Sequence, residues 1–357
     1  MRVAYTLEQC WHRVPGGTGI SAIEVVKELT QIEGLDLVGV AGRHRRPPTK
    51  GFLPPVKVAA LPLGGAALYE MWTRFNWPKV ESVIDDVDIV HATSIIPAAT
   101  DRPLVVTVHD LAFIRHPEFF TAHGNKVFAR SMRILQDRAS LLLCSSMNTY
   151  RDCLYAGFEE WRLRHVPLGV TTHIITDVDR ARVRDAYSLP EEFVLFVGTL
   201  EPRKNLVRLV EALSSMNDAP PLVVVGMEGW GDAAPLVGHD VRFTGFVPSE
   251  DLPALYNLCR VFAFPSIMEG YGLPVIEAMA HGAAVVTSRG TSTEEVAGGA
   301  AVLVDPLDVS SIAHGIREAL ASQDSWSARS LDRAAQVPWA ETARLTFAAY
   351  SELVDEA

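Results

Sequence analysis

Short runs of apolar residues alternate with longer amphipathic stretches along most of the chain. Short apolar runs are typical of strands buried on both faces, whereas apolar side chains at the spacing of a helical turn indicate helices. Their alternation predicts parallel sheets covered by helices, which is an α/β fold. Strands are expected at Val3–Leu7, Leu35–Ala41, Ile89–Ala92, Leu104–His109, Leu141–Ser145, Phe193–Val197, Leu222–Val225, Val241–Thr244, Val261–Phe264, Ala284–Thr287 and Ala301–Val304. Helices are expected at Gly19–Leu29, Lys126–Arg138, Leu206–Ser214, Ser249–Asn257, Pro274–Ala280, Val309–Ala321 and Trp339–Val354.

The length of the chain and a break in its pattern predict two domains. A chain of 357 residues is longer than one ordinary hydrophobic core requires. The pattern also restarts at Phe193, after the polar stretch 171–192. We therefore expect two Rossmann-like, doubly wound domains at residues 1–175 and 176–338, which face each other across a cleft. Residues 339–357 form a last helix that is able to cross back to the first domain.

Charge and composition exclude several classes of function. The formal net charge is −11, but residues 1–170 carry 19 Lys and Arg against 17 Asp and Glu, whereas the remainder carries 13 against 26. The acidic second half argues against nucleic-acid binding, which depends on neutralising phosphates. The four cysteines are scattered, no apolar run approaches the ~20 residues that cross a bilayer, and the first residues lack a signal-peptide pattern. These features favour a cytoplasmic protein with at most peripheral contact with the inner face of a membrane.

The segment that follows the predicted strand Val261–Phe264 carries the strongest chemical signal. Ligands bind doubly wound sheets beyond the carboxyl ends of the strands, and this strand is followed by a glycine loop and a helix that begins near Pro274. Glu269 and Glu277 lie eight residues apart across that junction, and a carboxylate accepts two hydroxyls of a sugar or ribose at once. The alternative is that these acids only complement the helix dipole. The N–H groups able to bind an anion at this helix start are those of Gly270, Tyr271, Gly272 and Leu273.

Two cations stand at a second turn between a strand and a helix. Arg203 and Lys204 follow the strand Phe193–Val197 and precede the helix Leu206–Ser214. Cations at a helix N-terminus oppose its dipole, so their presence indicates an anion nearby, such as a leaving diphosphate. An exposed basic turn without a ligand is the alternative.

These two segments resemble the retaining GT-B glycosyltransferases of family 4 (glycosyltransferase group 1). Glu269 and Glu277 form the E-x7-E element of that family, and the surrounding residues 265–282 are similar to it nearly residue for residue. The resemblance implies that Glu269 contacts hydroxyls of the donor sugar and that Glu277 contacts the ribose. The second segment matches the GTLEPRKN variant of mannosyltransferase-like members, from which Lys204 carries over directly. Arg203 is expected to replace the arginine that most members have where Thr199 stands here.

Further candidates come from the same resemblance. The segment around His109 and Asp110 is similar to the family pattern VHDLxxxxHPExF, which implies that His109 contacts the donor sugar near the reacting centre. A structural role is the alternative for this histidine, and the role of Asp110 stays open. The resemblance also implies that the nucleotide base lies against the backbone of residues 245–247, edged by Phe246 or Val247. Phe246 can equally be a core residue.

A glycine-rich segment precedes the first predicted helix. Gly17–Ala22 matches the dinucleotide pattern GxGxxA, but about ten residues separate Gly17 from the preceding strand, too many for the tight turn that the pattern requires. A flexible loop in which Gly16 and Gly17 let the backbone approach a diphosphate or an acceptor fits better. The basic residues 43–50 are interpreted as a solvated loop, with contact to an anionic lipid surface or a charged acceptor as the less favoured alternative.

The resemblance implies a specific reaction. A hexose passes, with retention, from a nucleotide-diphosphate sugar to a hydroxyl of a glycan, a lipid-linked or a small-molecule acceptor, as in the synthesis of cell-surface polysaccharides. GDP-mannose is the favoured donor, with UDP- or dTDP-sugars behind it. Neither a metal nor a cofactor is expected. The alternatives are a GT-B phosphorylase or epimerase, and a sugar-nucleotide-binding protein without catalysis.

Overall fold

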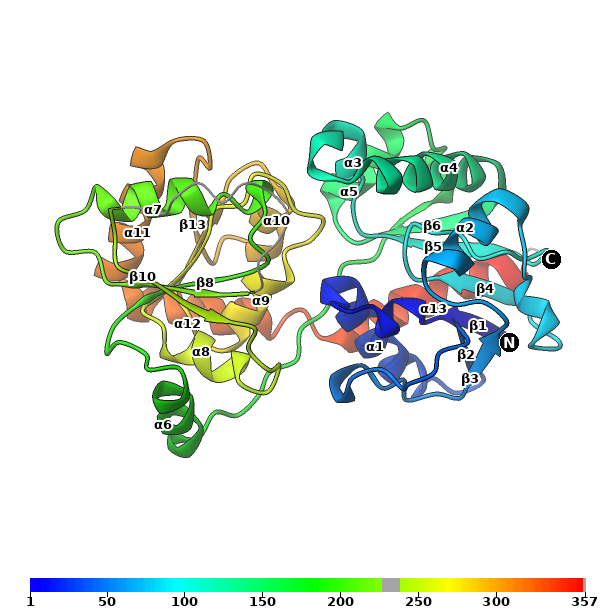
Figure 1. Cartoon of the computed structure of the whole chain (residues 1–357), viewed down its shortest axis with the longest axis horizontal. Helices are drawn as coiled ribbons and strands as arrows, with labels where there is room; N and C mark the ends of the chain where they lie inside the picture. Colours follow the sequence, from blue (N-terminus) through cyan, green and yellow to red (C-terminus); the bar gives the residue numbers. More distant parts are fainter. Residues whose placement is uncertain (227–237, 356–357) are drawn as a thin grey trace. The chain divides into compact units, whose positions relative to one another are not determined.

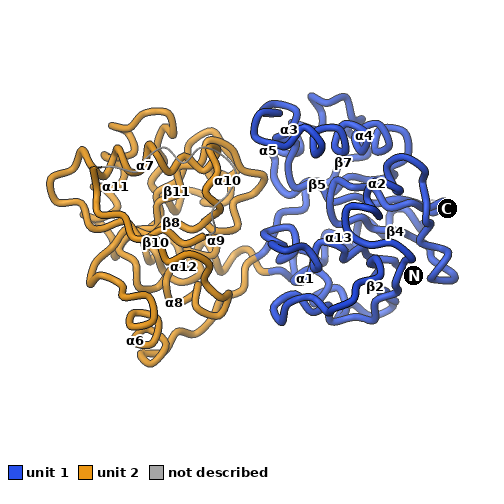
Figure 2. The backbone as a smooth tube through the Cα atoms, in the orientation of Figure 1, with its two compact units in different colours: residues 1–169, 339–357 blue, residues 170–338 orange. Residues whose placement is uncertain are grey.

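The structure of the chain, a computed structural model, describes residues 1–226 and 238–355. It divides into two compact units, residues 1–169 with 339–357 and residues 170–338 (Figure 2). Each unit contains one parallel sheet with helices on both faces (Figure 1). The last two residues of the predicted segment 339–357 lie outside the described residues.

Unit 1 contains a seven-stranded sheet in the order β3-β2-β1-β4-β5-β6-β7. The strands are β1 (Arg2–Thr6), β2 (Asp36–Gly42), β3 (Val58–Leu61), β4 (Ile89–Ala92), β5 (Leu104–Val108), β6 (Ala139–Cys144) and β7 (Leu163–His165). Its α-helices are α1 (Gly16–Leu29), α2 (Ala66–Phe75), α3 (Ala112–Arg115), α4 (Ala122–Arg138), α5 (Met147–Tyr155) and α13 (Trp339–Asp355). Helices α4 and α13 lie on opposite faces of the sheet (Figure 1), which explains why its central strands are apolar on both faces.

Unit 2 contains a six-stranded sheet in the order β10-β9-β8-β11-β12-β13. The strands are β8 (Val194–Val197), β9 (Leu222–Val225), β10 (Val241–Gly245), β11 (Val261–Phe264), β12 (Val285–Ser288) and β13 (Val302–Val304). Its helices are α6 (Asp177–Ala186), α7 (Leu206–Ser214), α8 (Leu252–Leu258), α9 (Leu273–Ala280), α10 (Ser292–Ala297), α11 (Val309–Ala321) and α12 (Gln323–Ala334). When the strands of each unit are numbered along the chain from its own first strand, this order is the same as the order β3-β2-β1-β4-β5-β6 in unit 1. Both sheets are therefore doubly wound, with a switch point between β1 and β4 and between β8 and β11.

The boundary between the units differs from the predicted one. The change occurs between Gly169 and Val170 rather than near residue 175. Val170 donates its N–H to the carbonyl of Val337 at 2.9 Å and pairs with Pro338, so the segment after it belongs to unit 2. The polar composition of residues 171–192 gave no sign of this short pairing.

The last helix, α13, packs within unit 1. It lies against α1, and its Tyr350 is fully buried. The hydroxyl of Tyr350 lies 2.5 Å from Nδ1 of His91 in β4, whose Nε2 lies 2.8 Å from the hydroxyl of Thr107 in β5. The C-terminal end of the chain thus completes one face of the N-terminal sheet.

Candidate functional site

Two turns meet at the carboxyl ends of the central strands of unit 2. Strands β8 and β11 are neighbours, and they flank the switch point of the sheet. The turn after β8 leads to residues 202–204, and the turn after β11 leads to Glu269. The backbone N–H of Ile267 donates to the carbonyl of Arg203 at 2.8 Å, which joins the two turns directly. This is the position at which doubly wound sheets bind ligands.

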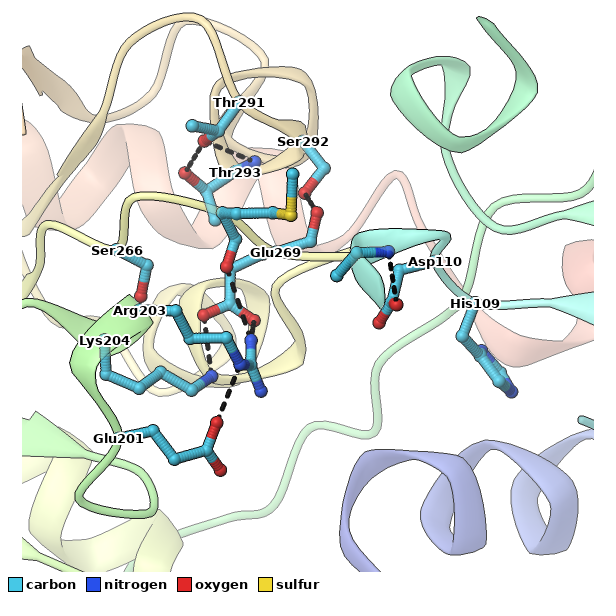
Figure 3. Close-up of polar contacts among 12 residues, drawn as sticks. His109, Asp110, Glu201, Arg203, Lys204, Ser266, Glu269, Thr291, Ser292 and Thr293 are labelled. Carbon is cyan, nitrogen blue, oxygen red and sulfur yellow. Dashed lines mark hydrogen bonds and ion pairs between the residues drawn. The ribbon is translucent and has the colours of Figure 1, made fainter. Parts of the chain in front are cut away.

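An ionic cluster fills the meeting point of these turns (Figure 3). Nζ of Lys204 lies 2.6 Å from Oε1 of Glu269, and Nη1 of Arg203 lies 3.0 Å from Oε2 of the same carboxylate. Nε of Arg203 lies 2.7 Å from Oε2 of Glu201. The side chains of Lys204 and Glu269 are each 8% exposed, so this pairing takes place away from bulk water.

The charges of the cluster stabilise one another. Burial works to raise the pKa of Glu269, but Lys204 and Arg203 outweigh it, and the pKa is lowered. Burial lowers the pKa of Lys204, and the neighbouring Glu269 opposes this effect. Although burial disfavours the charge of Lys204, the adjacent carboxylate of Glu269 favours it, and a cation at this position is able to bind a diphosphate.

The turn that carries Lys204 is held by contacts of Asn205 and Lys204 with neighbouring segments. Asn205 adopts a left-handed conformation with a φ of +63°, which ends the turn and starts α7. Its side-chain amide donates to the carbonyl of Pro265 at 2.9 Å and to that of Pro306 at 2.6 Å. Nζ of Lys204 also lies 4.8 Å from the centre of the Phe264 ring, a cation–π distance.

The glycine loop leads directly into α9, which begins at Leu273. Gly272 has a φ of +110°, and a Cβ there would come within 2.8 Å of Cγ2 of Thr293, so glycine is required. The N–H groups of Gly272 and Leu273 make no hydrogen bond with any described residue. The hydroxyl of Ser292 donates to the carbonyl of Glu269 at 2.7 Å and holds the loop. Gly270 and the buried Tyr271 lie between Glu269 and Gly272 in this loop.

Glu277 lies within α9, and its contacts differ from those of Glu269. The hydroxyl of Tyr256 donates to its Oε2 at 3.1 Å. Burial raises the pKa of Glu277, although the hydrogen bond from Tyr256 opposes the rise. The structure therefore brings Glu269, Lys204 and Arg203 into one cluster, whereas Glu277 is hydrogen-bonded to Tyr256 of α8.

The two candidates after β10 differ in exposure. Phe246 is 69% exposed, so it is not a core residue, whereas Val247 is 5% exposed and packs inside unit 2. Gly245 before them has a φ of +71°. An exposed aromatic ring next to a glycine turn leaves backbone and ring accessible to a flat ligand.

In unit 1, His109 follows β5 at the carboxyl edge of the sheet. Its Nε2 lies 3.3 Å from the carbonyl of Thr93, and its own carbonyl accepts hydrogen bonds from Ser145 and Thr149. Burial lowers the pKa of His109, which keeps the imidazole neutral at neutral pH. Asp110 accepts the N–H of Ala112 at 3.0 Å, which orders the start of α3. His109 lines a small cavity together with Tyr5, His91, Thr93, Val166 and Thr346.

Gly16 and Gly17 do not form a loop. They are the first two residues of α1, which begins three residues before the predicted start, and both are exposed. Gly16 has a φ of +59°, and Gly19 packs against Pro15 and Phe52. Two glycines are poor helix formers, so the pattern alone placed them outside the helix.

The sequence did not single out Glu201, which the structure pairs with Arg203. Its position two residues before Arg203 was the available signal.

Among residues 1–226 and 238–355, no group of three or more His, Cys, Asp or Glu is arranged to hold a metal ion. Within the same part of the chain, no helix is both long and apolar enough to span a membrane.

Two family models match most of the chain. The family described as Glycosyltransferase Family 4 matches residues 15–174, and Glycosyl transferases group 1 matches residues 179–336. The O-antigen chain mannosyltransferase B of Escherichia coli is 34% identical over 275 residues, which are 70% of each chain. The serotype-specific mannosyltransferase WbdA of Escherichia coli is 30% identical over 276 residues, which are 70% of this chain and 33% of WbdA.

The fold comparison agrees with these matches. The solved structure of HepE from Anabaena in complex with UDP and glucose has a TM-score of 0.74 and 17% identity, and the match covers 99% of this chain and 100% of HepE. Each unit has the Rossmann-like topology of the GT-B fold. The two matched families and the identity to a mannosyltransferase show that the chain belongs to the group 1 and family 4 glycosyltransferases of the GT-B fold.

Proposed function

We propose that the chain transfers mannose from GDP-mannose to a hydroxyl of a growing polysaccharide or lipid-linked glycan, with retention at the anomeric carbon. Two observations support mannose. Both curated relatives cited above are named mannosyltransferases, and the turn after β8 has the sequence GTLEPRKN. UDP- and dTDP-sugars are the other donors to be compared.

The observation that carries this proposal is the Glu269–Lys204–Arg203 cluster at the switch point of unit 2. A nucleotide-diphosphate sugar offers hydroxyls and a diphosphate, and the cluster offers a carboxylate and two cations in contact. In our proposal Lys204 and Arg203 bind the diphosphate, Glu269 accepts hydroxyls of the mannose, and Glu277 accepts those of the ribose. The N–H groups of Gly270, Tyr271, Gly272 and Leu273 add donors to the diphosphate and the sugar.

The remaining candidates complete the donor site of this proposal. Phe246 and Val247 edge the nucleotide base, and Gly16 and Gly17 present the free N–H groups of the first turn of α1 to the diphosphate. His109, which is neutral at neutral pH, contacts the sugar near the reacting carbon. Asp110 orders the backbone that follows it.

In the proposed reaction, the bond between the anomeric carbon and the diphosphate oxygen breaks as the acceptor hydroxyl attacks from the same face. The leaving phosphate takes the proton of that hydroxyl, and the electron pair of the broken bond stays on GDP. Lys204, Arg203 and the helix N–H groups stabilise the charge that develops on the leaving oxygen, so the proposal needs no metal ion and no cofactor. The four cysteines are buried thiols, which suits work in the reducing cytoplasm.

The test compares donors and two variants. We expect a thermal-shift screen of GDP-, UDP-, ADP- and dTDP-sugars to give the largest rise in melting temperature with GDP-mannose. We then expect the purified enzyme to hydrolyse GDP-mannose slowly without an acceptor, and Glu269→Ala and Lys204→Ala to lower that rate by at least about a hundredfold. Folded variants with the full rate would refute the site. A larger shift with a UDP- or dTDP-sugar would refute the donor, and release of mannose 1-phosphate with free phosphate would indicate a phosphorylase.

A further inference from the structure

A buried carboxylate ties three turns together at the carboxyl edge of the unit 1 sheet. Glu8, two residues after β1, is 1% exposed. Its Oε2 accepts the N–H of Gly42 at 2.6 Å, and its Oε1 lies 3.0 Å from Nε2 of His44 and accepts the N–H of Gly65. A Cβ at Gly42 would come within 2.3 Å of Cα of Gly64, so only glycine allows this close approach. The loop after β2 therefore has a defined path.

A ring stack fixes the same loop at a second point. The rings of Trp11 and His44 lie parallel, with centroids 4.9 Å apart and an interplanar angle of 9°. Nε1 of Trp11 donates to the carbonyl of Arg46 at 3.0 Å. We call residues 43–46 the β2 loop. The side chain of His44 and the carbonyl of Arg46 thus hold the loop, while its arginine side chains are exposed, as the interpretation of residues 43–50 as a solvated loop expects.

The β2 loop carries positive charge without a counter-charge. Arg43, Arg45 and Arg46 are exposed, and their guanidinium groups make no hydrogen bond or ion pair with residues 1–226 or 238–355. The segments 9–23 and 37–69, which build this corner, contain no Asp or Glu. The carboxylate of Glu8 is buried and already accepts two N–H groups. Cations held close together repel one another, and this repulsion is relieved when an anion binds.

We propose that the three arginines of the β2 loop bind a phosphate group of the acceptor substrate. A guanidinium offers two parallel N–H groups that match phosphate oxygens, and a fixed backbone lowers the entropy lost on binding. The loop follows β2 at the edge of a doubly wound sheet where ligands bind. The inference rests on the proposed function, which draws its donor contacts from unit 2 and from Gly16, Gly17 and His109 of unit 1 and assigns no residue to the acceptor. It adds to that function the chemical class of the acceptor, a phosphate- or diphosphate-bearing molecule.

The first test uses inorganic pyrophosphate as the probe, in the full chain with Lys204→Ala to weaken the donor site. Isothermal titration compares this protein with the same protein carrying Arg43→Ala, Arg45→Ala and Arg46→Ala. We expect the loop variant to bind pyrophosphate at least about tenfold more weakly. A matched control carries Arg102→Ala, Lys126→Ala and Arg133→Ala, which removes the same charge from exposed positions elsewhere in unit 1. Equal losses in both variants, or no loss in the loop variant, would overturn the proposal.

A second test separates an acceptor phosphate from a lipid surface. Vesicles of phosphatidylcholine with phosphatidylglycerol are sedimented with the wild-type chain and with the loop variant. Equal vesicle binding by both proteins, together with the loss of pyrophosphate binding, supports the proposal. Loss of vesicle binding without loss of pyrophosphate binding would instead assign the loop to a membrane.

A third measurement distinguishes failure of this inference from failure of the proposed function. With Lys204 intact, the loop variant is expected to hydrolyse GDP-mannose at the wild-type rate, because the β2 loop does not belong to the donor site. A loop variant that has lost this hydrolysis would contradict the inference. A wild-type chain that never hydrolyses GDP-mannose would contradict the proposed function, and the pyrophosphate titration would still decide whether the loop binds phosphate.

Discussion

Lys204 and Glu269 form an ion pair of 2.6 Å across the two turns that end β8 and β11, and only 8% of either side chain is exposed. The two residues follow neighbouring strands at the switch point of unit 2, so the geometry of the sheet brings them together. Each of them supplies the charge that makes burial of the other tolerable. This mutual dependence leads to predictions about stability and about binding.

The first prediction concerns stability. Lys204→Met and Glu269→Gln each leave one buried charge without its main partner, which costs on the order of 3 kcal/mol in free energy of unfolding. The double variant removes both charges, so it is expected to lose less than the sum of the single losses by more than about 1 kcal/mol. Urea unfolding of the four proteins measures this coupling. Strictly additive losses would show that the pair is not coupled.

The second prediction concerns the nucleotide. Glu269 contacts both cations that the proposed diphosphate needs, so the carboxylate and the diphosphate are expected to compete for them. Glu269→Gln is therefore expected to bind GDP as tightly as the wild type or more tightly, whereas Lys204→Met binds it at least about tenfold more weakly. Isothermal titration with GDP measures both, and Glu192→Gln, an exposed acid of the same unit, is the control. Weaker binding by Glu269→Gln would argue against the competition.

The third prediction concerns pH. Burial raises the pKa of Glu277, so part of this carboxyl is protonated at a pH at which an exposed glutamate is fully ionised. A protonated carboxyl accepts ribose hydroxyls poorly, so the affinity for GDP is expected to rise with pH as the group ionises. Glu277→Gln should flatten this dependence. Tyr256→Phe removes the hydrogen bond that lowers the pKa, so it should move the rise to higher pH. Titrations with GDP between pH 5 and 8 measure how the affinity of each protein depends on pH. The same dependence in both variants as in the wild type would show that Glu277 does not cause it.

The fourth prediction concerns the start of α9. Gly272→Ala combines a left-handed backbone with a Cβ 2.8 Å from Thr293, so we expect a loss of about 2 kcal/mol in stability and weaker GDP binding. Gly290→Ala is the matched control, because Gly290 also has a positive φ but nothing within 4 Å of its Cβ. It should cost about 1 kcal/mol and leave GDP binding unchanged. Thermal unfolding and GDP titration of the two variants measure these effects. Equal losses of stability and of GDP binding in both variants would contradict the steric explanation.

The fifth prediction concerns the contact between α13 and the unit 1 sheet. Burial, and then the nearby His109, lower the pKa of His91 to about 3. Because the pKa in the folded state is depressed, the neutral ring stabilises the fold fully above about pH 6.5, and this stability is lost as the pH falls towards 3. His91→Gln should lower the melting temperature at pH 7.5 through the lost contact with Tyr350. It should also make the decline of the melting temperature between pH 7 and pH 4.5 shallower. A decline as steep as that of the wild type would contradict the role of His91 in this pH dependence.

The sequence by itself determined the elements that depend on local pattern. Strand β9 and helices α7 and α11 have the predicted ends, because their apolar residues follow one period without a break. It also indicated the turns at Arg203–Lys204 and Glu269, since glycine, proline and charged residues there follow directly after buried strands. Short polar elements such as β7 and α6 were not predicted, because their burial comes from neighbours rather than from their own residues.

The tertiary structure alone decided which of these residues touch. Strand order in a parallel sheet is set by crossover connections, so nothing local to residue 204 or 269 showed that β8 and β11 are neighbours. The same holds for Tyr350 against His91 and for Glu8 beneath the β2 loop. The last two of these contacts join residues that are tens to hundreds of positions apart, and their free energy depends on burial that exists only in the folded chain.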